Sequence, residues 1–571
     1  MAERFHFIGL RQGYSVLENI SGVRDEIGGK AHGLFSIRNA VDRLEGQFPG
    51  IHIDIPSLTV LGTSVFDAFM ERNGLAEIAT SNLPDDRIAF AFQNADMPFE
   101  VLGELRKLVT EVTTPLAVRS SGLLEDTTHR PFAGVYATKM IPNNQPDLDI
   151  RFRKLLEAIK YVWASTYFKV AKDYFKATCL ECDHEKMAVV LQEMVGRHHG
   201  LRYYPELAGV ARSFNYYPIQ PAKPQDGVVD LALGLGKTIV DGGKTWTYSP
   251  AFSRRPPPFE SVDEIFAETQ NEFWAVNMGE PPEYNPVKET EFMQQYDLQA
   301  AESDGSLRFV ASTFDVQSER FSAGVAGKGP RAITFAPLLT AEELPFNRVV
   351  KSVLTECEKE LATPVEIEFA MTFNPHHFAV LQVRPMVVPA GNLEVSDRDL
   401  SHRHNLAASE LVLGNGVDED ITDVVYVKPD KFELKHTRRI AEELETINRI
   451  LLSQNRPYIL IVFGRLGTFD PWLGIPVAWG QVCGARVIVE ATQENVKVEL
   501  SQGSHYFHNL INLGVKYFSM PFTRPYRLDW KWLMKQPGVH DMEFIRHIEM
   551  PSPFFVKVDG RSGRGIIRRP E

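Results

Sequence analysis

Several features that mark particular classes of protein are missing from this sequence of 571 residues. No apolar run approaches the roughly 20 residues of a membrane-spanning helix, and the densest one, Tyr458–Phe463, suits a buried strand. The N-terminus, Met-Ala-Glu-Arg-Phe-His, has no apolar stretch of the kind a secretory signal contains. Four cysteines are too few for a disulfide scaffold and are typical of a reducing compartment. We therefore expect a cytoplasmic protein that does not enter a membrane.

An excess of positive charge is also missing. The sequence has 61 Lys and Arg against 74 Asp and Glu, a formal net charge of −13. This balance argues against general binding to nucleic acid or to an anionic membrane surface, although it does not exclude a local basic pocket. The remaining composition, 44% hydrophobic and 24% charged, is that of a globular protein without repeats or low-complexity tracts.

Helix and strand signals alternate along the first two thirds of the chain, which predicts an α+β or α/β fold. The length predicts about three to four domains. The expected helices cover residues 30–44, 99–109 and 151–176, and the expected strands cover 187–191, 228–233, 365–369 and 378–383.

Residues 385–425 lose clear periodicity and are rich in glycine and acidic residues, which predicts a domain boundary. An amphipathic helix over 436–453 and strands over 458–463 and 485–489 are expected beyond it. We assign residues 15–390 to a first domain, 391–424 to a linker and 425–571 to a smaller C-terminal α/β domain.

The segment Ala117–Asp126, followed by Pro131–Gly134, combines an arginine, two serines and small residues at the end of an expected strand. Arg119 can hold phosphate oxygens in a bidentate fork, and serine hydroxyls and backbone N–H groups can add further donors. The alternative is a surface turn with a solvated arginine.

Two further polar pairs lie on the strands expected at 365–370 and 378–385. Glu366 and Glu368 are two residues apart and share one strand face, and Gln382 and Arg384 do the same. A hairpin would set these faces side by side as a cradle for magnesium and a polyphosphate. The alternative is an exposed strand face with salt bridges.

The glycine-rich stretch Ala232–Thr238 invites comparison with the phosphate-binding loop of the P-loop proteins. That loop needs a glycine five residues before its Gly-Lys pair, and Leu231 stands there. A P-loop fold is therefore not expected, although the glycines permit a tight turn near a ligand.

Cys179 and Cys182 form a Cys-x-x-Cys pair with His184 nearby, which is one half of a zinc site. A second Cys/His pair at zinc-finger spacing is absent from the sequence. Ordinary reduced thiols are the expectation.

Taken in order, five motifs resemble the nucleotide-binding domain of the phosphoenolpyruvate synthase and pyruvate phosphate dikinase family over about residues 15–390. The motifs are Gly28-Gly-Lys-Ala31, Ala117-Val-Arg-Ser-Ser121, Phe132-Ala-Gly134, Gly234-Leu-Gly236, and Glu366-Ile-Glu368 leading to Leu381-Gln-Val-Arg-Pro385. The resemblance implies an ATP-grasp fold that holds ATP and magnesium between two α+β lobes.

The resemblance also implies a role for individual residues. Lys30 and Arg119 would contact ATP phosphates, and Glu366 and Glu368 would bind magnesium. The remaining positions would contact the nucleotide: Gln382 and Arg384 beside the transferring phosphate, Gln192 and Glu193 on the strand that leads to the adenine, and Gly234 and Gly236 in the glycine turn.

The sequence departs from the family pattern at several points. Lys237 stands where the family has an acid after its Gly-Leu-Gly, and Glu366 replaces an aspartate. After residue 390 about 180 residues remain, fewer than the about 250 of the barrel that binds pyruvate in full-length members. A complete pyruvate dikinase reaction within this chain is therefore not expected.

Ser501–Val515 faintly resembles the family's phosphohistidine segment, which predicts that His505 accepts phosphate from ATP and relays it. Three alternatives stay open: His508 is the functional imidazole, both histidines are structural, or this region binds a ligand together with Arg465, Asp470 and Trp472.

Three functions are compatible with these observations. The first is an ATP- and magnesium-dependent phosphotransferase with an unknown acceptor. The second is a regulatory module that binds ATP without turnover, and the third is a scaffold that has lost ATP. A partner protein or a second copy of the chain is an open expectation.

Overall fold

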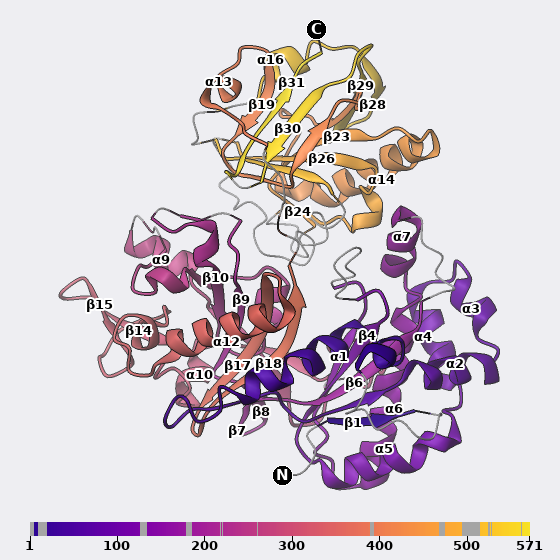
Figure 1. Cartoon of the computed structure of the whole chain (residues 1–571), viewed down its shortest axis with the longest axis vertical. Coiled ribbons are helices and arrows are strands. Elements are labelled where there is room, and N and C mark those ends of the chain that lie inside the picture. Colours follow the sequence, from indigo (N-terminus) through magenta and orange to yellow (C-terminus); the bar gives the residue numbers. More distant parts are fainter. Residues whose placement is uncertain are drawn as a thin grey trace. The chain divides into compact units, whose positions relative to one another are not determined.

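The computed structural model describes most of the chain. The described residues are 5–9, 20–125, 134–178, 185–216, 218–219, 221–257, 259, 261–281, 283–386, 388, 393–467, 474–493, 514–522, 526, 528–560 and 562–570. They form two compact units: unit 1 comprises Met1–Lys172 and Glu181–Met386, and unit 2 comprises Asp173–Leu180 and Val387–Glu571. The architecture mixes helices with several sheets, as the alternating sequence pattern predicts (Figure 1).

Unit 1 contains two large sheets and two smaller ones. The first large sheet has the order β1 (Phe5–Ile8), β3 (Leu58–Leu61), β6 (Met187–Glu193), β4 (Leu116–Gly122), β5 (Thr138–Ile141). The second has the order β11 (Trp246–Tyr248), β10 (Val228–Ala232), β9 (Leu207–Arg212), β17 (Val365–Phe373), β18 (His376–Pro385), β2 (His52–Asp54). The smaller sheets are β13 (Met293–Asp297), β12 (Glu272–Asn277), β8 (Arg202–Tyr204), β7 (Arg197–His199), and β15 (Arg320–Ala323), β14 (Ala311–Asp315), β16 (Arg331–Ile333).

The helices of unit 1 precede, follow and connect these strands. They are α1 (Ile20–Asp42), α2 (Thr63–Arg72), α3 (Ala76–Thr80), α4 (Asp85–Asn94), α5 (Phe99–Glu111), α6 (Leu148–Ser165), the start of α7 (Lys169–Thr178), α8 (Lys237–Val240), α9 (Val262–Glu268), α10 (Leu298–Ser303), α11 (Ala336–Leu339) and α12 (Phe346–Leu361).

Helix α1 joins the two large sheets of unit 1. It contacts β4 and β6 of the first sheet, β18 of the second, and helix α12 (Figure 1). Gly33 permits this close approach, because a Cβ there would lie 2.7 Å from the carbonyl oxygen of Val383. Leu34, Ile37 and Val41 of α1 belong to one apolar core with residues of both sheets, as the helical spacing predicts. The two sheets are therefore held against one another through a shared core.

One long helix expected over residues 151–176 is two helices in the structure, α6 and α7. Thr166, Tyr167 and Phe168 donate their N–H groups to carbonyls three residues back, which tightens and ends α6. The N–H of Lys169 then donates to Asp85 Oδ1 at 2.7 Å, so a side chain from α4 caps the start of α7. This contact spans 84 positions and leaves no trace in the local pattern.

Unit 2 is built around a seven-stranded mixed sheet. Its order is β20 (Val412–Leu413), β27 (Lys516–Met520), β26 (Ala485–Ala491), β23 (Tyr458–Phe463), β22 (Asp423–Val427), β29 (Ile545–Glu549), β28 (Gly538–Asp541). A second sheet has the order β19 (Asn405–Ser409), β31 (Arg564–Arg568), β30 (Phe555–Asp559), β21 (Gly416–Asp418), and β24 (Arg465–Leu466) pairs with β25 (Gly474–Ile475). Among the described residues of unit 2, the helices include the end of α7, α13 (Asp397–Leu400), α14 (Thr437–Ser453) and α16 (Trp530–Leu533).

The apolar run Tyr458–Phe463 is fully buried as β23, and it pairs in parallel with β22 and β26. Burial on both faces explains why the run is continuously apolar rather than alternating. Helix α14 connects β22 to β23, which makes a parallel β-α-β unit.

The described residues between 393 and 424, expected as a linker, contribute α13, β19, β20 and β21 to unit 2. Leu406, Ala407 and Ala408 of β19 are buried. The glycines that suggested a linker mark the turn between two short strands, and Gly414 has a φ of +87° there.

Among the helices of the described residues, none is both long and apolar enough to cross a membrane.

Candidate functional site

The polar pairs predicted on β17 and β18 face one another in an antiparallel hairpin. Glu366 lies opposite Arg384, and Glu368 lies opposite Gln382. The register shifts between Glu368 and Phe369, so a bulge separates this polar end of the hairpin from the rest. The hairpin expected from the period-2 spacing is confirmed.

Glu366 is buried with only 2% of its surface exposed, and two guanidinium groups hold its carboxylate. Arg212 Nε of β9 donates to Glu366 Oε2 at 2.6 Å, and Arg384 forms an ion pair with Oε1. Arg212 also donates to Asp230 Oδ2 of β10 at 2.7 Å. Burial acts to lower the pKa of Arg212, but the attraction of Glu366 and Asp230 outweighs it and raises that pKa. The guanidinium therefore stays charged.

Arg119 extends from β4 of the first sheet to the hairpin of the second. Its Nη1 donates to the carbonyl oxygen of Leu381 at 2.8 Å and to Gln192 Oε1 of β6 at 3.0 Å. Its Nη2 donates to Gln382 Oε1 at 2.5 Å and to Glu368 Oε2 at 3.2 Å. The structure thus brings three predicted site residues, Gln192, Glu368 and Gln382, together around the guanidinium of Arg119, and Glu368 stays partly exposed.

Lys30 lies in a separate cluster. Its ammonium donates to Glu125 Oε1 at 2.6 Å and to Ser120 Oγ at 3.0 Å. The N–H of Gly122 donates to the other oxygen of Glu125 at 2.9 Å. Neighbouring residues of a strand point to opposite faces. The Arg119 side chain therefore reaches the β17–β18 hairpin, while the Ser120 side chain contacts Lys30 on the other face.

Gly28, two residues before Lys30, is required by the close packing of α1 against β4. Gly28 has a φ of +70° and interrupts α1, and a Cβ on it would lie 1.8 Å from the carbonyl oxygen of Ser121. Ser121 Oγ accepts from the N–H of Ala31 at 3.1 Å and donates to the carbonyl of Ile27 at 2.7 Å. The Gly-Gly-Lys-Ala and Arg-Ser-Ser motifs, 90 residues apart, therefore interlock.

The turn Gly234–Gly236 precedes the short helix α8. Gly234 has a φ of +84°, and a Cβ there would lie 2.7 Å from the carbonyl oxygen of Trp274 on β12. Lys237, which departs from the family pattern, pairs with Asp241 at 2.9 Å and lies over the Trp274 ring at 5.7 Å. Its positive charge is therefore partly neutralised by Asp241, the residue that follows α8.

Gln192 and Glu193 end β6. Gln192 is 2% exposed, and its Nε2 is a buried donor with no hydrogen-bond partner within the described part of the chain. Glu193 Oε2 accepts from Thr114 Oγ1 at 2.9 Å. A buried donor without a partner is costly, so Gln192 is suited to a ligand that supplies an acceptor.

Four charged residues of this region were not identified from the sequence: Arg212, Asp230, Glu125 and Glu185. Glu185 is 3% exposed, and burial followed by repulsion from Glu125 raises its pKa to about 8. Glu125 lay inside a motif already singled out. The other three carry no local signal, because only the fold brings them to the site.

Several predicted residues lie outside the described residues. They are His505, His508, Asp470, Trp472, Cys179, Cys182 and His184, together with Phe132 and Ala133 of one motif. Arg465 is described and belongs to β24.

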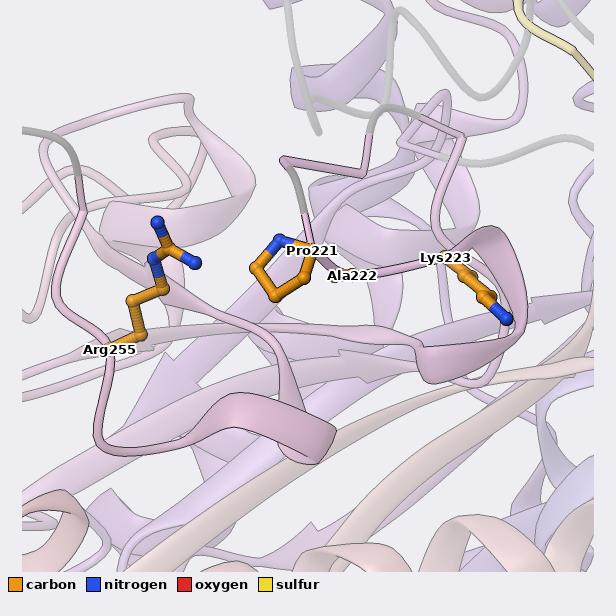
Figure 2. Close-up of a pocket in the computed structure, with 4 residues that line it drawn as sticks. All are labelled: Pro221, Ala222, Lys223 and Arg255. Atoms are coloured by element: carbon orange, nitrogen blue, oxygen red, sulfur yellow. The ribbon is translucent and has the colours of Figure 1, made fainter.

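An open hollow of about 530 Å³ is lined by Pro221, Ala222, Lys223 and Arg255. Figure 2 shows that the Lys223 side chain extends away from Arg255, so the two charges do not converge on one point. This hollow contains none of the predicted site residues.

The geometry can serve an anionic ligand with a bound cation. Guanidinium groups hold phosphate oxygens through paired N–H donors, and a partly exposed carboxylate such as Glu368 is a hard oxygen ligand. In this structure Arg119 and Arg384 satisfy those donors with carboxylates and amides of the chain itself. A ligand must therefore share or replace these partners.

Comparison with known proteins identifies a family and a relative. The family described as "Pyruvate phosphate dikinase, AMP/ATP-binding domain" matches residues 24–402. A phosphoenolpyruvate synthase of Aeropyrum pernix is 25% identical over 391 residues, which cover 63% of this chain and 40% of that protein. The chain thus corresponds to less than half of that relative's length. Because the family match covers most of the chain and includes every clustered residue above, this chain belongs to the pyruvate phosphate dikinase AMP/ATP-binding family.

Proposed function

We propose that unit 1 binds ATP with magnesium and catalyses transfer of a phosphoryl group from it. The observation that carries this proposal is the grouping of Arg119, Glu368 and Gln382 from three strands of two sheets, in a chain of an AMP/ATP-binding family. Phosphoryl transfer needs neutralised charge and correct positioning more than covalent chemistry. Arg119 and Arg384 supply the positive charge.

The two large sheets of unit 1 would form the two lobes of an ATP-grasp fold, with the nucleotide between them. Arg119 is the main support for this arrangement, because it belongs to one sheet and forms hydrogen bonds with side chains of both sheets. In this arrangement Gln192 Nε2 gains an acceptor from the nucleotide, which removes the cost of an unpaired buried donor.

Magnesium would neutralise phosphate oxygens and bind through carboxylates. Glu368 is the better placed ligand, since it is partly exposed and its single described bond is the long one of 3.2 Å to Arg119. Glu366 would have to exchange one of its two guanidinium partners to bind the ion. Its first role is to orient Arg384.

Lys30 would act on the phosphates from the second cluster. It has Glu125 as a buried counter-ion, so binding requires the ammonium to turn away from a pair 2.6 Å apart. The turn at Gly234 and Gly236 would approach the nucleotide through its backbone.

The phosphate acceptor is unknown. If His505 is the acceptor, ATP should leave a label on it that is stable to base and labile to acid, and the His505→Ala variant should lack that label. Equal labelling of both proteins, or of neither under turnover, would remove His505 from the mechanism.

A second candidate is an ATP-binding regulatory module without turnover. Lys237 favours it, because a cation beside Trp274 and Asp241 replaces the acid of the family. The carboxylate partners of Arg119 and Arg384 favour it as well, since they must be displaced before the arginines can act.

Incubation of the purified full chain with β-labelled and γ-labelled ATP and Mg²⁺ separates these candidates. Formation of AMP or ADP supports the phosphotransferase and identifies which bond is cleaved. Saturable binding without either product supports the regulatory module. Absence of binding contradicts both.

A further inference from the structure

The opposite end of the β17–β18 hairpin carries a second group of polar side chains. His377 lies near the start of β18, and β2 runs parallel beside it with His52 directly opposite. Asp54 follows His52 by two residues and so lies on the same strand face. With a rise of about 3.3 Å per residue, His377 is roughly 16 Å along the strand from Gln382. This group is therefore separate from the proposed nucleotide site.

The two imidazoles and the carboxylate converge. His377 Nε2 is 2.7 Å from Asp54 Oδ1, and His52 Nε2 is 3.1 Å from Asp54 Oδ2. The two rings stack with their centroids 5.0 Å apart. One ligand atom from each of the three residues lies within 4.8 Å of the others.

A fourth residue fixes the orientation of His52. Glu45 Oε1 is 2.8 Å from His52 Nδ1, and Glu45 Oε2 accepts the backbone N–H of Ile53 at 2.8 Å. Glu45 thus turns Nε2 of His52 toward Asp54. A carboxylate on the second nitrogen is the usual partner of a histidine that binds a metal.

We propose that His52, Asp54 and His377 bind a divalent transition metal ion, for which Zn²⁺ is the first expectation. Two imidazoles and one carboxylate form a donor set that suits Zn²⁺ and related ions, whereas Mg²⁺ prefers oxygen ligands alone. Three protein ligands leave a coordination position open for water. Binding requires Nε2 of both imidazoles to carry no proton, so the hydrogen bonds to Asp54 are exchanged for bonds to the ion.

The geometry needs only a small adjustment for such an ion. Zn–N and Zn–O bonds of about 2.0–2.2 Å in a tetrahedral site place ligand atoms roughly 3.3 Å apart. The contacts of Asp54 to the two histidines, 3.1 Å and 2.7 Å, are slightly shorter than that value, so the ligand atoms must move apart by a few tenths of an ångström to admit an ion. The His52 side chain is 41% exposed and that of His377 is 24% exposed, so an ion can reach the site from solvent.

The position in the sheet indicates what the ion would do. β2 is the outermost strand of its sheet and is only three residues long. A metal held by residues of β2 and β18 would tie this short edge strand to its neighbour. The proposal does not depend on phosphoryl transfer.

Zinc titration of the untagged full chain tests the site. The protein is stripped with a chelator and carries Cys179→Ser and Cys182→Ser, because this pair of thiols also suits zinc. Calorimetry with Zn²⁺, and visible absorbance with Co²⁺ as a probe, should show one equivalent bound. His377→Ala and Asp54→Asn should weaken binding at least 100-fold. Glu45→Gln should weaken it 10- to 100-fold.

Two controls complete the experiment. His198→Ala removes an exposed histidine on β7 of the same unit and should leave the titration unchanged. His52→Gln alters a side chain that is 41% exposed and serves if His377→Ala does not fold. A protein that binds no zinc, or binds it equally with and without these ligands, would show that the cluster is only a hydrogen-bonded edge and would overturn the proposal.

Discussion

Both units bury charged side chains among apolar strands, but the buried charges of the two units differ in whether they lead to partly exposed groups at a site. In unit 2, Asp423 of β22 pairs with His547 at 2.7 Å and with Arg456 at 2.8 Å. The side chains of Asp423 and His547 are at most 2% exposed, so this pair is closed off from solvent, while Arg456 is 26% exposed and also pairs with Glu549 at the surface. In unit 1, the buried Arg212–Glu366–Arg384 group is followed on the same hairpin by the partly exposed Glu368 and Arg119.

This difference predicts which substitutions affect stability and which affect activity. A closed buried pair keeps its partners whatever the solvent contains, and removing one partner leaves an uncompensated charge. An open network can exchange its outer partners for a ligand, while its inner ion pairs hold the charged groups in position. Changes in unit 1 should therefore affect turnover first, and changes at Asp423 should affect stability first.

The largest effect is expected from Arg119→Ala and Arg384→Ala in unit 1. Each variant should lower phosphoryl transfer by about 100- to 1000-fold, which is the typical loss when one preorganised donor is removed. Steady-state ATP turnover measures this loss. Arg72→Ala is the control, because Arg72 is an exposed residue of the same unit paired with Glu100. Wild-type turnover by both site variants would show that the catalytic pocket lies elsewhere.

Asp423→Asn should show the opposite pattern in unit 2. We expect a loss of about 3 kcal/mol in the free energy of unfolding, because the buried hydrogen bond of His547 and the ion pair of Arg456 both lose their carboxylate. Denaturant titration measures the loss, and ATP binding should not change. In the control Asp397→Asn, the altered side chain is 86% exposed and pairs with Arg564, so the change should stay below about 0.5 kcal/mol.

Sequence spacing predicted the hairpin but not what it contacts. Glu366, Glu368, Gln382 and Arg384 follow the period of a strand, so their shared face was predictable. The bond from Arg119 to Glu368 joins residues 249 positions apart, and nothing in the local pattern specifies it. The same holds for Lys30 and Glu125, 95 positions apart. The cluster of His52, Asp54 and His377 was also missed, since these residues carry no motif until β2 and β18 pair.

Gly28→Ala tests whether the interlocked motifs position Lys30. A Cβ at a φ of +70°, 1.8 Å from the carbonyl of Ser121, forces the backbone to move. We expect a loss of about 2 kcal/mol in the free energy of unfolding. Gly103→Ala on α5 is the matched control, because no atom lies within 4 Å of its Cβ and alanine favours a helix. Equal midpoints for the two variants would contradict the role of Gly28.

Glu368→Gln addresses the open end of the unit 1 network. An amide is a weaker ligand for a hard cation than a carboxylate, so the Mg²⁺ concentration for half-maximal activity at saturating ATP should rise about tenfold. Glu360→Gln on α12, which removes a surface partner of Arg43, is the control. An unchanged Mg²⁺ requirement would exclude Glu368 as a ligand.

The smallest effect concerns pH and the Lys30 cluster. Burial, followed by repulsion from Glu125, raises the pKa of Glu185 from its ordinary value of 4.5 to about 8. Between these values the folded chain holds a proton that the unfolded chain has released, so stability must fall as pH rises. The slope cannot exceed about 1.4 kcal/mol per pH unit, and we expect about 1 kcal/mol between pH 6 and pH 7.

Glu185→Gln keeps the shape of the side chain and removes its titration. The decline in the free energy of unfolding with pH should therefore flatten in this variant, as measured by denaturant titration at pH 5, 6, 7 and 8. Well below pH 4.5 the pH dependence of the two proteins should converge, because the Glu185 carboxyl is then neutral in both the folded and the unfolded wild type. Asp423→Asn in unit 2 should retain the wild-type slope over this range. Burial acts to raise the pKa of Asp423, but its hydrogen bonds and Arg456 outweigh burial and lower that pKa below its ordinary value. Asp423 therefore does not titrate between pH 5 and pH 8. If Glu185→Gln and the wild type decline in parallel, the proton is held elsewhere, and the buried acid near Glu125 is not the group that sets the pH response of unit 1.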